Sequence, residues 1–116
     1  MDDSGDTMWS FINTYVNSFA KWDLLIFFAE HDDVEEGAAS LSKHLARSQA
    51  EIARALEDLA AVGILEAVAD RDLGGDLYRL TRDDTAREQV RRFVEETRDR
   101  DTRLRVLTTL LRAGAR

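Results

Sequence analysis

The two histidines are the first residues to test for chemistry, because an imidazole can transfer a proton near neutral pH or bind a metal ion. His31 stands close to Asp32, Glu35 and Glu36. Imidazole and carboxylate together form a ligand set that zinc or manganese accepts. The spacing corresponds to no metal-binding motif, and an acidic loop in water explains it more simply. His44 is interpreted as a surface residue, so the sequence predicts no metal site and no cofactor.

Signatures of enzyme chemistry are missing from the sequence. The chain has no cysteine, which excludes disulfides, thiolate metal sites and cysteine nucleophiles. Gly74-Gly75 is not a phosphate-binding loop, because neither a Lys-Ser/Thr pair nor the start of a helix follows it. The carboxylates lie in polar runs, where ordinary ionisation is the default. We therefore predict a protein that is not an enzyme.

Length and composition predict one domain over residues 1–116, since 44% of the residues are hydrophobic and the chain is too short for two ordinary domains. The net charge of −7 is uneven: residues 1–37 carry −8, residues 38–82 carry −1 and residues 83–116 carry +2. No apolar run approaches the roughly 20 residues of a membrane-spanning helix. The first residues are acidic, unlike a secretory signal. We expect a cytoplasmic protein without a membrane partner.

The period of the apolar residues predicts three helices before the middle of the chain. The first is expected over residues 8–30 and a short second one over 38–46. Ser48, with a glutamate three residues later, has the features of a helix N-cap and predicts a third helix over 48–62. Gly63 stands where a helix end favours a residue with positive φ.

A β-hairpin and a helical region are expected to follow. Two short strand-like runs, 64–69 and 77–81, flank Gly74-Gly75 and predict the hairpin. Thr81 is expected to cap the next helix. The region 83–113 carries a heptad-like apolar stripe, which is compatible with one long helix or with two. The predicted fold class is mainly α with a small β-hairpin.

This order of elements resembles the winged helix-turn-helix domain of bacterial and archaeal transcription regulators. The resemblance is most specific in LSKHLARSQAEIARALEDLAAVGIL, residues 41–65. Positions that form the core in that family are occupied here by Leu41, Leu45, Ile52, Leu56 and Leu59. The family often has glycine where this chain has Ala46. The pattern covers residues 38–81, and the flanking helices make the layout similar to ArsR-type and MarR-type regulators.

The resemblance implies a DNA-binding transcriptional regulator whose partner is double-stranded DNA. The recognition helix would be 48–62, in the major groove, and the wing would be 65–81, on the DNA backbone. Residues opposite the apolar face of that helix are expected at base edges: Gln49, Ala50, Ala53 and Arg54. Residues suited to phosphate contacts near the turn are Lys43, Arg47 and Ser48, and those in the wing are Arg71, Arg79 and Arg82.

The charge of the recognition helix argues in the opposite direction. Glu51, Glu57 and Asp58 place three acids beside the one arginine of this helix, Arg54. Carboxylates near phosphates are unfavourable, and no basic block dominates the chain. The alternative function is a winged-helix module that binds proteins and not DNA.

In ArsR-type and MarR-type regulators the flanking helices form the dimer interface, so the resemblance also implies a homodimer. The residues expected in this interface are Trp9, Ile12, Tyr15, Phe19, Leu104, Leu107 and Leu111. The alternative is that these residues pack on the chain's own core. The sequence identifies no small-molecule effector, and the cysteines with which some ArsR-type proteins sense metals are absent.

Overall fold

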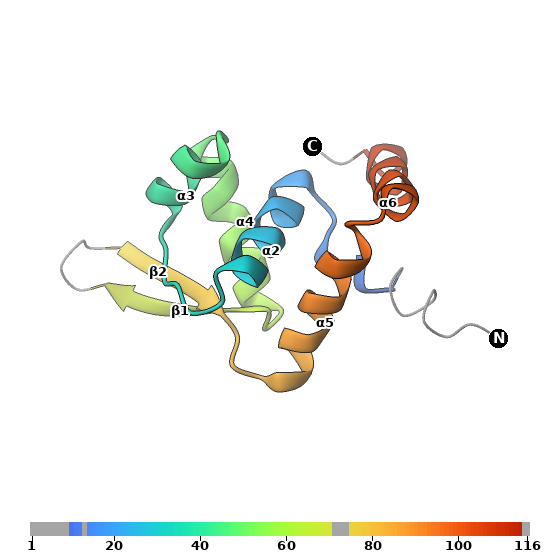
Figure 1. Cartoon of the computed structure of the whole chain (residues 1–116). Coiled ribbons are helices and arrows are strands. Elements are labelled where there is room, and N and C mark those ends of the chain that lie inside the picture. The colour runs from blue at the N-terminus through green and yellow to red at the C-terminus, as the bar shows by residue number, and fades with distance from the viewer. Residues whose placement is uncertain (1–9, 13, 71–74, 115–116) are drawn as a thin grey trace.

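Figure 1 shows the computed structural model, which describes residues 10–12, 14–70 and 75–114. The elements in chain order are α2 (Phe19–Glu30), α3 (Ala38–Leu45), α4 (Gln49–Ala61), β1 (Leu65–Asp70), β2 (Gly75–Leu80), α5 (Asp84–Glu96) and α6 (Arg100–Arg112). Residues 10–12 and 14–15 are also helical. The predicted fold class, mainly α with a small β-hairpin, is confirmed. Two predicted site residues, Trp9 and Arg71, lie outside the described residues.

The predicted single helix over 8–30 is wrong, because the chain leaves the helical conformation at Val16 and begins α2 only after Ser18. Ser18 has extended backbone and its hydroxyl accepts a hydrogen bond from the amide of Lys21 at 3.2 Å. A serine in this role caps a new helix and does not continue the old one. The apolar period runs through the break because Ile12 and Val16 are both buried in the same core.

The helix-turn-helix follows the sequence prediction closely. Ser48 caps α4, and its hydroxyl accepts a bond from the amide of Glu51 at 3.1 Å. Ala46 ends α3 with φ +56°, the left-handed conformation that glycine adopts most easily. The amide of Arg47 donates to the carbonyl of Ser42 at 3.0 Å and closes the turn. This short connection fixes the start of α4 relative to α3.

The predicted hairpin is present, with β1 and β2 antiparallel and Leu65 opposite Leu80. Gly63 has φ +82° after the end of α4 and directs the chain into β1. The segment before α3, predicted as an acidic loop, also forms a bridge to the sheet. The amide of Glu36 donates to the carbonyl of Tyr78 at 3.0 Å, and the amide of Tyr78 donates back at 2.8 Å. The hairpin is therefore anchored on both sides of its second strand.

The C-terminal region forms two helices, which settles the alternative left open by the apolar stripe. Asp99 begins α6, because its carboxylate accepts bonds from the amide and the hydroxyl of Thr102 at 3.0 and 2.9 Å. The expected cap of α5 by Thr81 is wrong. Asp83 caps that helix, and Thr81 is buried with its hydroxyl accepting a bond from the amide of Asp83. Thr81 thus shapes the turn that precedes the helix.

Helix α2 lies at the centre of the fold, where it packs against both α4 and α5 (Figure 1). Helix α3 packs on α4, the hairpin extends to one side, and α6 follows α5 on the opposite side. The fully buried side chains include Leu24, Leu25 and Phe28 of α2 and Ile52 and Leu56 of α4. This shared core holds the helix-turn-helix rigidly. No helix in the described ranges has the length and apolar character needed to cross a membrane.

Candidate nucleic-acid interface

Helix α4 presents one face to the core and the opposite face to solvent. Its inward residues Ile52, Ala55, Leu56 and Leu59 are all buried. Gln49, Ala50 and Arg54, predicted to meet base edges, are exposed, and Ala53 is half-buried. Because the core side cannot rotate outward without unpacking the protein, the orientation of the outer face is determined by the fold.

The N-terminal end of α4 and the end of α3 together offer a small polar surface. Ser48 is exposed at the helix start, next to Gln49 and Ala50. Lys43, in the last turn of α3, is also exposed. Helix N-termini attract anions because their first amides lack partners within the helix. The tight turn brings these residues to one edge of the molecule.

Arg47, predicted to contact phosphate, is engaged inside the protein. Its Nε donates to the carboxylate of Asp23 at 2.7 Å, and its Nη1 lies 3.5 Å from Glu51. The hydrogen bond to Asp23 raises the pKa of the guanidinium further above its ordinary value. Arg47 therefore ties the turn to α2, and its charge is neutralised by two acids.

Arg79, predicted to contact DNA from the wing, is also paired. Its Nε donates to Glu66 on the neighbouring strand at 2.9 Å, and its Nη1 lies 4.0 Å from Glu35. Glu66 also accepts a bond from the amide of Arg82 at 3.3 Å. The bond from Arg79, followed by that amide, lowers the pKa of Glu66. Arg79 thus braces the base of the hairpin, whereas the side chain of Arg82 is in no ion pair with a described residue.

The acids of α4 fall into two groups. Glu51 is close to Arg47, and Asp58 lies 3.3 Å from the ammonium group of Lys21. Glu57 is exposed, and no described base pairs with it. Burial first, and then the charges of Asp76 and Glu57, raise the pKa of Tyr78 on β2. The negative character of this helix is therefore concentrated toward its C-terminal half, near the hairpin, and away from Gln49.

Both histidines lie against one aromatic ring, a contact that sequence reasoning missed. The ring centroids of His31 and His44 are 4.8 and 5.3 Å from that of Phe27. The contact joins the end of α2 to the last turn of α3. The only sequence signal for it is that Phe27 and His31 are four residues apart on one helical face.

The predicted dimer residues occupy different environments. Ile12 is 1% exposed and belongs to the core of its own chain, so it cannot meet a partner. Residues only partly buried against the core are Tyr15, Phe19 and Leu107. Leu104 and Leu111 are 47% and 61% exposed. Among the predicted interface residues that the structure describes, the large apolar side chains that are exposed to solvent therefore lie only on α6.

Comparison with known proteins supports the fold. No protein-family model matches the chain, and no curated protein matches it. The solved structure of a possible transcriptional regulator from Methanosarcina mazei Go1 superposes with a TM-score of 0.59 and 20% sequence identity. The match covers 86% of this chain and 83% of that one. The two chains therefore share a winged-helix-like fold, mostly helical with one antiparallel hairpin.

Proposed function

We propose that this protein is a DNA-binding transcriptional regulator. The observation that carries the proposal is the exposed start of α4, where Gln49, Ala50 and Arg54 face solvent while the opposite face is locked in the core. A glutamine can bond both polar atoms of an adenine edge and an arginine those of a guanine edge. The similarity in fold to a possible transcriptional regulator is in agreement with this role.

The paired arginines restrict which residues serve as contacts. We assign base recognition to Gln49 and Arg54 and backbone contact to Lys43 and the amides at the start of α4. Arg47 and Arg79 hold the turn and the wing in position. The wing would contribute chiefly by its shape and through the side chain of Arg82. The homodimer remains a prediction, and its two recognition helices would lie about 34 Å apart along the DNA.

The test is a fluorescence anisotropy titration of the purified chain with DNA fragments that include its own promoter region, at several salt concentrations. We expect affinity to fall steeply as salt rises, because phosphate contacts release bound counterions. Arg54→Ala and Gln49→Ala should each weaken binding by about 1–3 kcal/mol on the preferred sequence. Solution mass measured in parallel tests the dimer.

Arg91→Ala is a matched control, since Arg91 is an exposed arginine on α5 that pairs only with Glu88 among the described residues. It should leave DNA binding unchanged. Absence of binding at every salt concentration would refute the proposal. The remaining candidate would then be a protein-binding winged helix, which is favoured by the exposed Glu57 and the net charge of −7.

A further inference from the structure

Helix α6 is attached to the protein along a narrow stripe. Only Val106 and Leu110 are buried, and Leu107 packs partly against the core. Leu104 and Leu111 point away from this stripe and are the most exposed large apolar residues among those described. They are seven residues apart, so they lie on one face about 10.5 Å from each other. An apolar pair with this spacing matches the seam that one helix offers to another.

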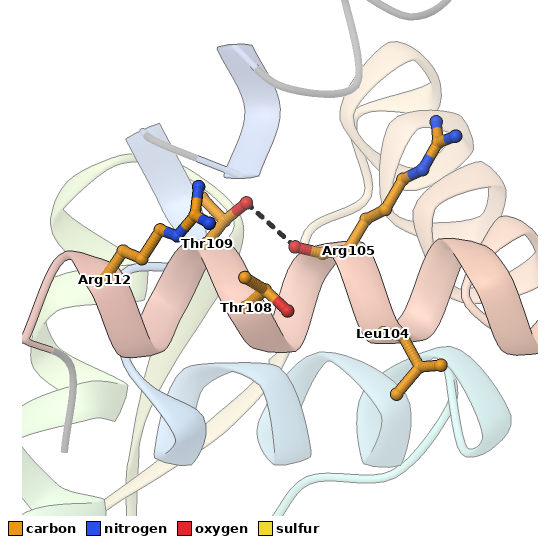
Figure 2. Close-up of a pocket in the computed structure, with 5 residues that line it drawn as sticks. All are labelled: Leu104, Arg105, Thr108, Thr109 and Arg112. Atoms are coloured by element: carbon orange, nitrogen blue, oxygen red, sulfur yellow. Dashed lines mark hydrogen bonds between the residues drawn. The ribbon is translucent and has the colours of Figure 1, made fainter.

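A shallow cavity of about 320 Å³ runs along the solvent side of the same helix. The residues that line it are Leu104, Arg105, Thr108, Thr109 and Arg112. Figure 2 shows Arg105 and Arg112 on one side of the helix and Leu104 on the other, with Thr108 between them. Thr109 is half-buried and donates its hydroxyl proton to the carbonyl of Arg105 at 2.8 Å. The surface thus combines an apolar edge, a hydroxyl and two cations.

Four of the described arginines that form no ion pair with a described residue lie together on α6; the others are Arg54, Arg82 and Arg92. Arginines that pair with a nearby acid are Arg47, Arg79, Arg87, Arg91 and Arg98. On α6, the arginines are Arg100, Arg103, Arg105 and Arg112, all exposed, and none of them forms an ion pair with a described residue. The one acid within the helix is Asp101. In a protein of net charge −7, this helix is a local cationic surface.

This charge pattern argues against pairing of α6 with α6 of a second copy, so a homodimer would form through elements other than the predicted Leu104 and Leu111. Arg105 and Arg112 flank the leucines on one side (Figure 2). Arg103 precedes Leu104 by one residue, so the turn of the helix places it toward the other side. Whether two such helices run parallel or antiparallel, arginines would face arginines along the seam. Like charges placed together across an interface are unfavourable and reject a partner. The same pattern is complementary to a helix whose apolar ridge is flanked by carboxylates.

We propose that the outer face of α6 is a docking site for an acidic amphipathic helix of another protein. Leu104 and Leu111 would receive the apolar ridge of that helix, and Arg105 and Arg112 would pair with its carboxylates. DNA is the less suitable occupant, because the phosphate backbone offers nothing apolar to cover two exposed leucines. The site lies on a different element from the proposed DNA contacts, so a regulator could hold both partners at once.

The experiment uses the full chain and a labelled synthetic peptide of about three heptads, with leucine along one seam and glutamate on both flanks. A second peptide, with lysine in place of glutamate, is the control ligand. The protein variants are Arg105→Gln/Arg112→Gln, Leu104→Ala/Leu111→Ala and, as the control, Arg91→Gln. All substituted residues are exposed, and circular dichroism checks that each variant folds.

We expect the glutamate peptide to bind and the lysine peptide not to bind. Each double variant on α6 should lower the affinity about fivefold or more, while the control leaves it unchanged. Only the arginine variant should also reduce the salt dependence. Equal binding of both peptides would overturn the proposal. So would a loss of DNA affinity confined to the arginine variant, or conversion of a dimer into a monomer by the leucine variant.

Discussion

The bond between Arg47 and Asp23 leads to a prediction that separates a structural arginine from a DNA-contacting one. The perturbation is a double-mutant cycle of Arg47→Gln and Asp23→Asn. The two side chains are 26% and 38% exposed and their charged atoms are 2.7 Å apart. At this distance the Coulomb attraction is about 1.5 kcal/mol in water and about 6 kcal/mol at an effective dielectric of 20.

Several costs reduce that attraction. Both groups lose part of their hydration, and ordering an arginine side chain costs up to about 2 kcal/mol of rotamer entropy. Exposed ion pairs retain about 0.2–1 kcal/mol, while bonds to charged groups reach about 1.5–3 kcal/mol. For this half-buried pair we expect a coupling free energy of about 1 kcal/mol. Urea denaturation of the four proteins measures it, provided that the transition is two-state.

DNA binding supplies the second measurement. Each lost phosphate contact should reduce the slope of log affinity against log salt by about 0.9. We expect this reduction for Lys43→Gln, because Lys43 is exposed and in no ion pair with a described residue. Arg47→Gln should leave the slope unchanged. A coupling energy of zero, together with a slope reduced by Arg47→Gln, would refute the assignment of Arg47 to the protein's own framework.

Three further predictions concern stability. Ala46→Gly should stabilise the protein by about 0.5 kcal/mol, because removing the Cβ relieves a left-handed residue and this gain exceeds the added entropy of the unfolded chain; the urea midpoint measures it. The Glu66–Arg79 bond lowers the pKa of Glu66. The stability that this bond contributes is therefore complete above the ordinary pKa of 4.5 and is lost as the pH falls through the lowered pKa. Denaturation measured between pH 7 and pH 3 should show a loss of stability that is smaller in Arg79→Gln than in the unchanged protein. Leu56→Ala should cost about 2–5 kcal/mol, since Leu56 is fully buried. Trp22→Phe should cost less, because the buried indole N–H that it removes has no acceptor in the described part of the chain; thermal unfolding compares the two variants.

Each of these predictions has a matched comparison. Ala53→Gly, within α4, should destabilise by about 1 kcal/mol, since glycine inside a helix has only an entropic cost. A loss of stability in Ala46→Gly as large as that in Ala53→Gly would show that the positive φ of Ala46 carries no strain. An acid-induced loss of equal size in Arg79→Gln would contradict the role of the ion pair. If Trp22→Phe were the more damaging core variant, aromatic packing would outweigh the orphaned donor.

Local rules were enough for the central part of the fold. The Ser48 cap, the turn at Ala46 and the helix end at Gly63 depend on residues within a few positions of each other, and the hairpin pairs residues that are at most 15 positions apart. Such features follow from backbone sterics and from short side-chain bonds to the backbone. The exposed set around Gln49 could be predicted for the same reason, since the periodicity of one helix determines its outer face.

The break before Ser18 shows where local reasoning failed. Apolar spacing alone could not distinguish one long helix from two segments, because Val16 lies in the bend and is buried like the apolar residues before and after it. The sequence leaves the helix boundary at Asp99 equally ambiguous, and the capping bond that Asp99 accepts from the amide of Thr102 defines it. In both places the path of the backbone depends on a polar side chain, Ser18 or Asp99, that could either lie within a continuous helix or cap a new one.

The amino-acid sequence by itself determined which residues α4 can present to a partner, because a helix with one apolar face has only one way to bury it. Tertiary structure alone decided which charges are available. Arg47 meets Asp23 across 24 positions and Arg79 meets Glu66 across 13, whereas the arginines of α6 form no ion pair with a described acid. The physical reason is that the attraction between two charges depends on their distance in space, which only the folded chain defines.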